Sequence, residues 1–271
     1  FNKNYTSKDI QFITKNFQEI YKERKNEIKN LKDQETFRKD FIGNLSHELK
    51  TPLFSIQGYI ETLLDGGIDD KKVNLKYIKR AQKSVERLIY IIQDLDFITK
   101  FDSGVEKIKK SCFNLIETID NVVDSLEPRF KERSLNLLFD QTEKKVLKVF
   151  GDEKKIHQVL INLITNSIKY GVDDGTIEVK LEENDNSKVI VSIIDNGLGI
   201  PREDLARIFE RFYRVEKTRN RDEGGSGLGL SIVKHIIDAH DEKISVQSEE
   251  GVGSNFSFSL QLFISDNKQQ Q

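Results

Sequence analysis

The first hundred residues carry apolar side chains at steps of three and four, and a break at Asp65-Gly66-Gly67 divides the pattern. Such spacing places the apolar side chains along one face of an α-helix. We therefore expect two long helices joined by a short turn, an antiparallel hairpin that ends near Gly104. Each helix offers one apolar stripe, so hairpins from two copies of the chain are expected to pair as a dimeric four-helix bundle. The stripes consist of Ile42, Leu45, Leu49, Ile56, Ile60 and Leu63, then Ile78, Ala81, Val85, Leu88, Ile92 and Leu95.

Residues 1–36 continue the helical pattern toward the N-terminus, with an interruption near Arg24. The region is so rich in charge that its narrow apolar stripe needs a partner. This favours a two-stranded coiled coil over a single surface helix. The stripe consists of Ile10, Ile13, Phe17, Ile20, Ile28 and Leu31.

The second half of the chain alternates short strands with helices. This arrangement predicts an α+β fold, an α/β sandwich with helices on one face of a sheet. We expect strands over 177–181, 189–194, 244–248 and 255–262, and helices over 115–133, 153–170 and 229–239. The expected domains are a coiled coil (1–36), a helical hairpin (37–104), a linker (105–110), an α/β sandwich (111–263) and a polar, disordered tail (264–271).

Composition excludes several classes of protein. The 43 basic and 45 acidic residues leave a net charge of −2, whereas a nucleic-acid binder usually carries a basic excess. The single cysteine, Cys112, excludes an internal disulfide, and we expect it to be a small buried residue in a reducing, cytosolic setting. No apolar stretch approaches the roughly 18 residues of a membrane span. The chain lacks methionine and begins at Phe1, so we expect a processed chain or a piece of a longer one.

His47 is the first candidate for chemistry. It lies about 200° around the helix from Leu45 and Leu49, so it is expected to point away from the apolar stripe. Glu48 and Thr51 fall on the same exposed side. A solvent-facing imidazole beside a carboxylate can act as a nucleophile or a proton acceptor. The alternative is an ordinary surface histidine.

A second candidate lies in the expected helix 153–170. Asn162 and Asn166 are four residues apart and therefore share one helical face, and Lys169 and Tyr170 follow within a turn. Amide oxygens can bind a hard cation, a lysine can meet phosphate, and a tyrosine ring can pack on a flat base. The alternative is a mixed helix end with an asparagine cap.

Two glycine-rich segments complete the set of candidates. Residues 195–200 (DNGLGI) follow an expected strand, and residues 224–230 (GGSGLGL) open an expected helix. Glycines at a helix start let backbone N–H groups approach phosphate, and a buried acid after a strand can accept a hydrogen bond from an exocyclic amine. Between them, 209–214 and the basic run to Arg221 would complement a triphosphate, or would form a solvated loop. Neither segment is a P-loop or a dinucleotide fingerprint.

In this order, the segments resemble the transmitter region of the bacterial sensor histidine kinases, over about residues 37–263. The matching boxes are the H box (41–52), the N box (157–170), the G1 box (195–200), the F box (209–214), the G2 box (225–230) and a final glycine box (251–256). The run 211–229 also looks like that of the phosphate-regulon sensor subgroup. The resemblance implies Mg-ATP as cofactor.

The resemblance also assigns roles to individual residues. His47 would be the phosphoacceptor, Glu48 the acid or base beside it, and Thr51 a residue that positions water in a phosphatase reaction. Asn166 would hold Mg²⁺, and Asp195 would read the adenine amino group. The other implied nucleotide contacts are Asn162, Lys169 and Tyr170 of the N box, Gly197, Gly199 and Ile200 of the G1 box, Phe209, Phe212 and Arg214 of a flap, and Gly225, Gly227, Leu228 and Gly229 of its hinge.

The implied activity is autophosphorylation of His47 by ATP, followed by transfer to an aspartate of a response regulator. Such a chain would be a homodimer and the cytoplasmic portion of a membrane-anchored sensor, with residues 1–36 passing on the signal. One rival is another ATPase of the same nucleotide fold, related to chaperones or topoisomerases, which would hydrolyse ATP without a phosphorylated side chain. Another is a dimeric scaffold that binds ATP only as a structural ligand.

The remaining histidines have simpler interpretations. His235 and His240 are five residues apart, which does not bring them together as zinc ligands on a helix. His157 is interpreted as structural.

Overall fold

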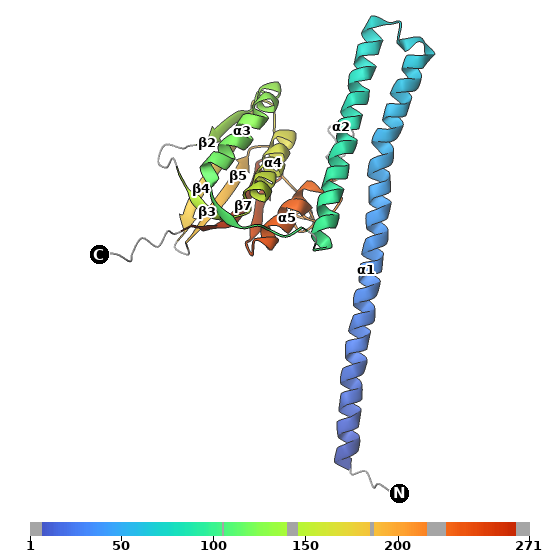
Figure 1. Cartoon of the computed structure of the whole chain (residues 1–271), viewed down its shortest axis with the longest axis vertical. Coiled ribbons are helices and arrows are strands. Elements are labelled where there is room, and N and C mark those ends of the chain that lie inside the picture. The colour runs from blue at the N-terminus through green and yellow to red at the C-terminus, as the bar shows by residue number, and fades with distance from the viewer. Residues whose placement is uncertain (1–6, 105, 140–145, 185–186, 216–225, 264–271) are drawn as a thin grey trace, which may run out of the picture. The chain divides into compact units, whose positions relative to one another are not determined.

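A computed structural model describes residues 7–104, 106–139, 146–184, 187–215 and 226–263 (Figure 1). The chain divides into two compact units, Phe1–Thr51 and Pro52–Gln271. Gly225, the basic residues Lys217, Arg219 and Arg221, and the predicted tail lie outside the described residues.

Two long helices occupy the first hundred residues, as the apolar spacing predicts. Helix α1 runs from Ser7 to Thr62 and α2 from Lys71 to Asp102, with a π-helical turn, η1, at Leu63–Gly67 between them. Gly66 takes φ +102°, a left-handed conformation that a side chain would disfavour. The Asp70 carboxylate caps α2 by accepting a hydrogen bond from the Lys72 N–H at 2.8 Å.

Part of the apolar stripe of each helix is exposed within one copy of the chain, whereas stripe members such as Leu49 and Leu88 are half-buried. In α1, Phe17 and Leu31 are exposed, and in α2 the side chains of Ile78, Val85 and Ile92 are exposed by 43–55%. The chain therefore leaves uncovered part of the surfaces that the sequence predicts to pair with a second copy. Among the described residues, none of the helices combines the length and apolar character that a membrane span requires.

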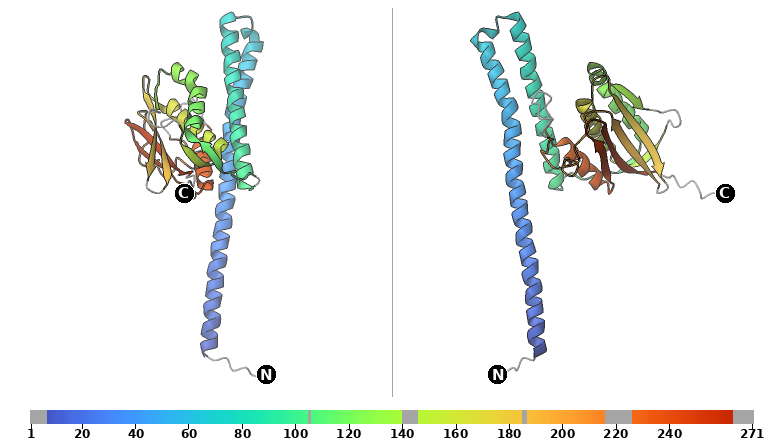
Figure 2. Two further views of the ribbon diagram at one scale, coloured as in Figure 1. Left: turned by 60° about the vertical axis from the view of Figure 1, so that its left-hand side comes forward. Right: turned by 180° about the vertical axis from the view of Figure 1, so that it is seen from behind.

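The remainder of the second unit is a seven-stranded sheet with helices on one face (Figure 2). The strand order is β1-β3-β7-β5-β4-β2, with β6 also paired to β7, and β2 and β4 form the one parallel pair among the described strands. The strands are β1 (Ser111–Asn114), β2 (Asn136–Phe139), β3 (Lys148–Gly151), β4 (Thr176–Asn184), β5 (Lys188–Asp195), β6 (Ile244–Glu249) and β7 (Gly253–Leu262). The helices are α3 (Leu115–Glu132), α4 (Glu153–Tyr170) and α5 (Gly229–Ala239).

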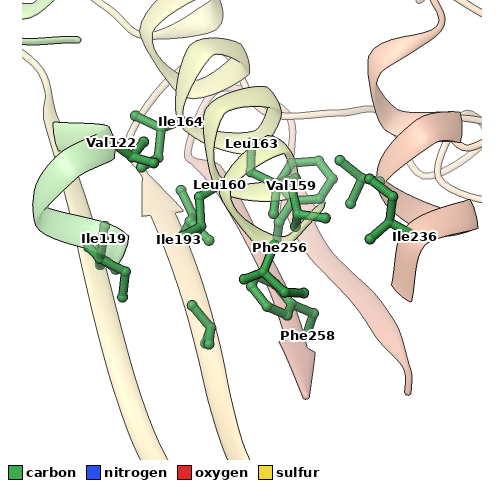
Figure 3. Packing of buried hydrophobic residues seen from close by; sticks show 14 of the residues in the cluster. Ile119, Val122, Val159, Leu160, Leu163, Ile164, Ile193, Ile236, Phe256 and Phe258 are labelled. Atoms are coloured by element: carbon green, nitrogen blue, oxygen red, sulfur yellow. The ribbon is translucent and has the colours of Figure 1, made fainter. Parts of the chain in front are cut away.

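The core lies between these three helices and the sheet. Figure 3 shows Ile119 of α3, Leu160 and Leu163 of α4, and Phe256 and Phe258 of β7 packed together. Burying each such side chain stabilises the fold by about 1.5–3 kcal/mol relative to exposure. This packing holds α4 against the end of β5, which is where the candidate site lies.

One sequence-based expectation about this domain is wrong. Cys112 is exposed, whereas we expected it to be buried. It lies in β1, where its neighbour Phe113 is 7% exposed and faces the core. Because successive residues of a strand face opposite sides, burial of Phe113 turns Cys112 toward solvent.

Candidate functional site

A buried carboxylate marks the point where the central strand of the sheet meets α4. Asp195 ends β5, lies opposite Ser254 of β7, and is only 8% exposed. Its carboxylate accepts hydrogen bonds from the Ser167 hydroxyl of α4 at 3.0 Å and from the Gly197 backbone N–H at 3.0 Å. The sequence-based expectation of a buried acid after a strand is thus confirmed in its geometry.

Burial also changes the protonation of this acid. Desolvation raises the pKa of the Asp195 carboxyl, while hydrogen bonds from Gly197, Ser167 and Ser254 pull the pKa back down. A carboxylate offers about four acceptor positions, so these three donors leave it able to accept one more. The chemical partner it suits is a group that brings an N–H or O–H donor.

The loop after β5 follows a path that only glycine permits. A Cβ on Gly197 would lie 2.4 Å from the carbonyl oxygen of Tyr170, and one on Gly199 would lie 1.9 Å from the carbonyl oxygen of Glu249. Gly199 also takes φ +65°. The two glycines thus let the loop press against the end of α4 and against the β6–β7 turn, which fixes the position of Asp195.

The polar face of α4 lies next to this loop. Asn162, Asn166, Lys169 and Tyr170 are all half-buried, as their spacing on one helix predicts. The Asn162 side-chain amide donates to the Gly229 carbonyl at 3.4 Å. The Lys169 ammonium donates to the Tyr170 hydroxyl at 2.9 Å and lies 4.5 Å from the centre of the Tyr170 ring.

The second glycine segment starts α5 beside Asn162. Gly227 takes φ +71°, and a Cβ there would lie 2.8 Å from the backbone of Phe212. Phe212 itself has φ +62°, and its N–H donates to the Gly227 carbonyl at 2.9 Å. Leu228 is fully buried in the core. This pairing brings the F box and the G2 box together, although Gly225 lies outside the described residues.

The other F-box residues contact the same region. The Phe209 ring packs edge-on against Phe256 with centroids 6.5 Å apart, and the Lys234 ammonium lies 5.8 Å from the Phe209 ring centre. Arg214 is half-buried. Ile200 is half-buried at the end of the G1 box, where its N–H donates to the Ser248 hydroxyl at 2.9 Å.

The predicted phosphoacceptor, His47, belongs to the first unit. His47 and Thr51 are exposed on α1, as predicted, whereas Glu48 is half-buried. The Thr51 hydroxyl donates to the His47 carbonyl at 3.2 Å. Helix α1 continues through Pro52, which lacks an N–H to donate to the carbonyl four residues earlier.

The residues of the α4–β5–α5 cluster fit a magnesium nucleotide. The spare acceptor capacity of Asp195 suits an exocyclic amine, and the start of α5 offers backbone N–H groups and a positive dipole end to phosphates. The Asn166 amide oxygen is a ligand type that Mg²⁺ accepts, with phosphate oxygens and water completing its shell.

Sequence reasoning missed Ser167 and Ser248. Ser167 lies in the buried stripe of α4 with Leu163, Ile164 and Ile168, and is 2% exposed. A hydroxyl at an apolar position of a helix signals a buried partner, here Asp195. Ser248 stands in an alternating strand, where nothing in the sequence distinguishes it.

A hollow of about 630 Å³ opens on the face of the sheet that points away from the helices. Glu178, Gln247 and Asn255 line it, and they share the strand face that points away from the helices. Asp195, Ser248 and Ser254 also line this hollow, so it reaches the end of β5 where the Asp195 carboxylate lies.

The histidine at the end of α5 has a structural role. His240 is 4% exposed, its Nε2 accepts from the Asp152 N–H at 2.9 Å, and its Nδ1 lies 2.8 Å from the Ile236 carbonyl oxygen. These contacts require a neutral ring protonated at Nδ1, and burial lowers the pKa of His240 accordingly. His157 is half-buried in α4.

Two family models match the chain. Residues 37–104 match the His Kinase A (phospho-acceptor) domain, and residues 151–264 match the histidine kinase-, DNA gyrase B-, and HSP90-like ATPase. The first match contains His47, and the second contains α4, Asp195 and both glycine segments.

Individual relatives extend these matches. The sensor histidine kinase WalK of Bacillus subtilis is 35% identical over 229 residues, which are 84% of this chain and 37% of that protein. The chain therefore spans little more than a third of that relative. The structure of the Acinetobacter baumannii histidine kinase AdeS superimposes with a TM-score of 0.64 at 27% identity, over 80% of this chain and 98% of that one.

A third match is a complex. The histidine kinase ThkA, solved with the response regulator protein TrrA, superimposes with a TM-score of 0.64 at 28% identity, over 82% of this chain and 60% of that one. The named relatives do not confirm the finer resemblance to the phosphate-regulon sensors, which stays a prediction.

Proposed function

We propose that this chain, which belongs to the sensor histidine kinases, transfers the γ-phosphoryl group of Mg-ATP to His47. Two observations in the same chain carry the proposal. His47 is exposed on a helix that matches the phosphoacceptor family, and the residues around buried Asp195 fit a nucleotide. An ATPase of the same nucleotide fold that phosphorylates no side chain would not require the helix that carries His47.

The nucleotide would be held by the cluster on α4, β5 and α5. Asp195 accepts a hydrogen bond from the adenine amino group, and the Tyr170 ring packs on the base. The Lys169 ammonium and the backbone N–H groups at the start of α5 face the phosphates. Asn162 and Asn166 lie on the intervening face of α4, where Asn166 holds Mg²⁺, which neutralises phosphate charge when bound.

The transfer asks little covalent chemistry of the protein. One imidazole nitrogen of His47 attacks the γ-phosphorus, the bond to the bridging oxygen breaks, and ADP leaves. Glu48 keeps the ring proton on the other nitrogen, so the attacking nitrogen carries a lone pair. In-line positioning and charge neutralisation supply the acceleration.

Incorporation of label from γ-labelled Mg-ATP tests this activity. We expect label in the unaltered chain, none in His47→Gln, and about 30- to 160-fold slower labelling in Asp195→Asn at limiting nucleotide. His157→Gln is the matched control, because this histidine lies in α4 with no assigned contact to nucleotide, and it should keep full labelling. Labelling of His47→Gln at the original rate would refute the assignment of His47.

The next acceptor would be an aspartate on a response regulator. The structure of ThkA with TrrA supports a partner of this class. The exposed hydroxyl of Thr51 lies one helical turn from His47, where it would position water for dephosphorylation of the regulator. We expect Thr51→Ala to keep autophosphorylation and to lose regulator dephosphorylation. Equal phosphatase rates in the two proteins would contradict this role.

The active form would be a homodimer through α1 and α2. The exposed apolar side chains of both helices support this, because residues such as Leu31 and Ile92 lie in water in a single chain. Light scattering should give about 63 kDa, twice the chain mass of 31.4 kDa, at micromolar concentration. A mass of one chain would contradict the dimer.

We further propose the domain division 1–36, 37–104, 105–110 and 111–263, and a membrane-anchored parent protein with this region in the cytoplasm.

A further inference from the structure

The C-terminal end of α2 packs against the nucleotide-binding domain within the second unit. Phe97 and Ile98 are 7% and 4% exposed and belong to the same core cluster as α4 and α5. The Phe101 ring meets His235 of α5 edge-on at 4.9 Å, and the Lys155 ammonium of α4 lies 4.5 Å from the Phe97 ring centre. Asp94 precedes these residues by three, four and seven positions and therefore lies on the same face of α2.

Asp94 reaches the glycine segment that starts α5. Its carboxylate accepts a hydrogen bond from the Ser226 hydroxyl at 2.9 Å, and the oxygen of that hydroxyl accepts from the Leu228 backbone N–H at 3.1 Å. Burial raises the pKa of the Asp94 carboxyl, and the bond from Ser226 partly offsets this shift. Asp94 therefore loses part of its hydration where it holds Ser226 of the G2 box.

These two hydrogen bonds occupy the Leu228 N–H, a backbone donor that a bound phosphate would use. Leu228 is the N-cap of α5, and the backbone N–H groups at the start of a helix bind anions. Here the Leu228 N–H is bonded to a hydroxyl whose own proton is committed to a carboxylate.

We propose that Asp94 is a positioning residue that latches the glycine segment: through Ser226 it occupies the Leu228 N–H and holds this segment on α2 until nucleotide phosphate displaces the Ser226 hydroxyl. The Asp94 latch, consisting of Asp94, Ser226 and the Leu228 N–H, rests on the proposed nucleotide site. Nucleotide binding breaks the bond between Ser226 and Leu228 and weakens the hold of Ser226 on Asp94. Binding is thereby coupled to release of the domain from the end of α2.

The latch makes a directional prediction about affinity. Titration calorimetry with Mg-ADP, which binds without phosphoryl transfer, should show about three- to tenfold tighter binding to Asp94→Ala, the equivalent of about one net hydrogen bond. Asp94→Asn, whose amide keeps an acceptor oxygen, should give a smaller gain. The matched control is Asp96→Ala on the solvent side of the same helix, where Asp96 pairs with Lys100. It should leave the affinity unchanged.

A double-mutant comparison separates the latch from simple charge repulsion. If Asp94 acts through Ser226, adding Asp94→Ala to Ser226→Ala gives no further tightening. If Asp94 merely repels phosphate, the gain persists in the Ser226→Ala background. A second readout is amide hydrogen exchange of residues 91–101, which should accelerate on Mg-ADP binding in the unaltered chain and already be fast in Asp94→Ala.

Several results would overturn the proposal. Unchanged or weaker Mg-ADP binding by Asp94→Ala, or a full additive gain in the double variant, would exclude the latch while leaving the nucleotide site intact. Absence of Mg-ADP binding in the unaltered chain would instead refute the proposed site, and the latch with it.

Discussion

Replacing the buried acid by its amide, Asp195→Asn, tests the nucleotide site with the least structural change. The side chain keeps its shape, and its remaining oxygen still accepts from the Gly197 N–H. The new amide NH₂ then faces the Ser167 hydroxyl, which can rotate to accept, 3.0 Å away in the present structure. Because burial raises the pKa of Asp195, the ionised acid costs stability at neutral pH. We expect the variant to be as stable as the original chain or slightly more stable.

The cost appears in nucleotide binding. The adenine amino group donates a hydrogen bond, and in Asp195→Asn it would meet a donor instead of an ionised acceptor. Losing a bond to a charged group and leaving its partner unsatisfied costs about 2–3 kcal/mol, or about 30- to 160-fold in Kd. Inosine nucleotides carry an oxo group at this position, so the amide should accept them better than the acid does.

Titration calorimetry with Mg-ADP and Mg-IDP measures both effects. We expect Asp195→Asn to weaken ADP binding and to narrow or reverse the preference for ADP over IDP. The matched control is Glu242→Gln, another buried acid made neutral, which lies at Lys188 and Ser259, outside the cluster. It should leave ADP affinity unchanged. Equal losses for ADP and IDP, or no loss, would refute the assigned role of Asp195.

Two further predictions concern the fold that holds the site. Gly199→Ala places a Cβ 1.9 Å from the Glu249 carbonyl oxygen at φ +65°, so it should lower the free energy of unfolding by at least about 2 kcal/mol. Its control Gly251→Ala, at φ +80° with open space, should cost about 1 kcal/mol by urea unfolding; equal losses would contradict this. The lowered pKa of His240 means that the unfolded chain binds a proton first, so stability should fall as pH drops below 6.5. Urea midpoints at about pH 7.5 and about pH 5.5 should differ less in His240→Gln; an unchanged difference would exclude His240 as the cause.

Periodicity predicts the long elements of this chain well. Helices α4 and α5 have the bounds expected, because their apolar stripes are continuous and Asp152 caps α4 by accepting from the Lys155 N–H. The strands β4, β5, β6 and β7 alternate over enough residues to be recognised. Strands β1, β2 and β3 have four residues each, too few to show a pattern, and their pairing depends on distant parts of the chain.

The residues of the candidate site also differ in whether the sequence alone can predict them. His47, Asp195 and the glycines are recognisable because their types and local spacing carry the chemistry. Asp94 and Ser226 are 132 residues apart, and no local pattern links an acid in one helix to a serine between glycines. Such partners appear only once packing brings the segments together.

Mapping the phosphorylated residue after incubation with γ-labelled Mg-ATP tests the central claim most directly. If His47 is the phosphoacceptor, mass spectrometry of peptides kept at alkaline pH will find an acid-labile, alkali-stable phosphate on its imidazole. Nucleotide binding or hydrolysis without any phosphate on His47 would contradict it and favour the scaffold or the other ATPases of this fold.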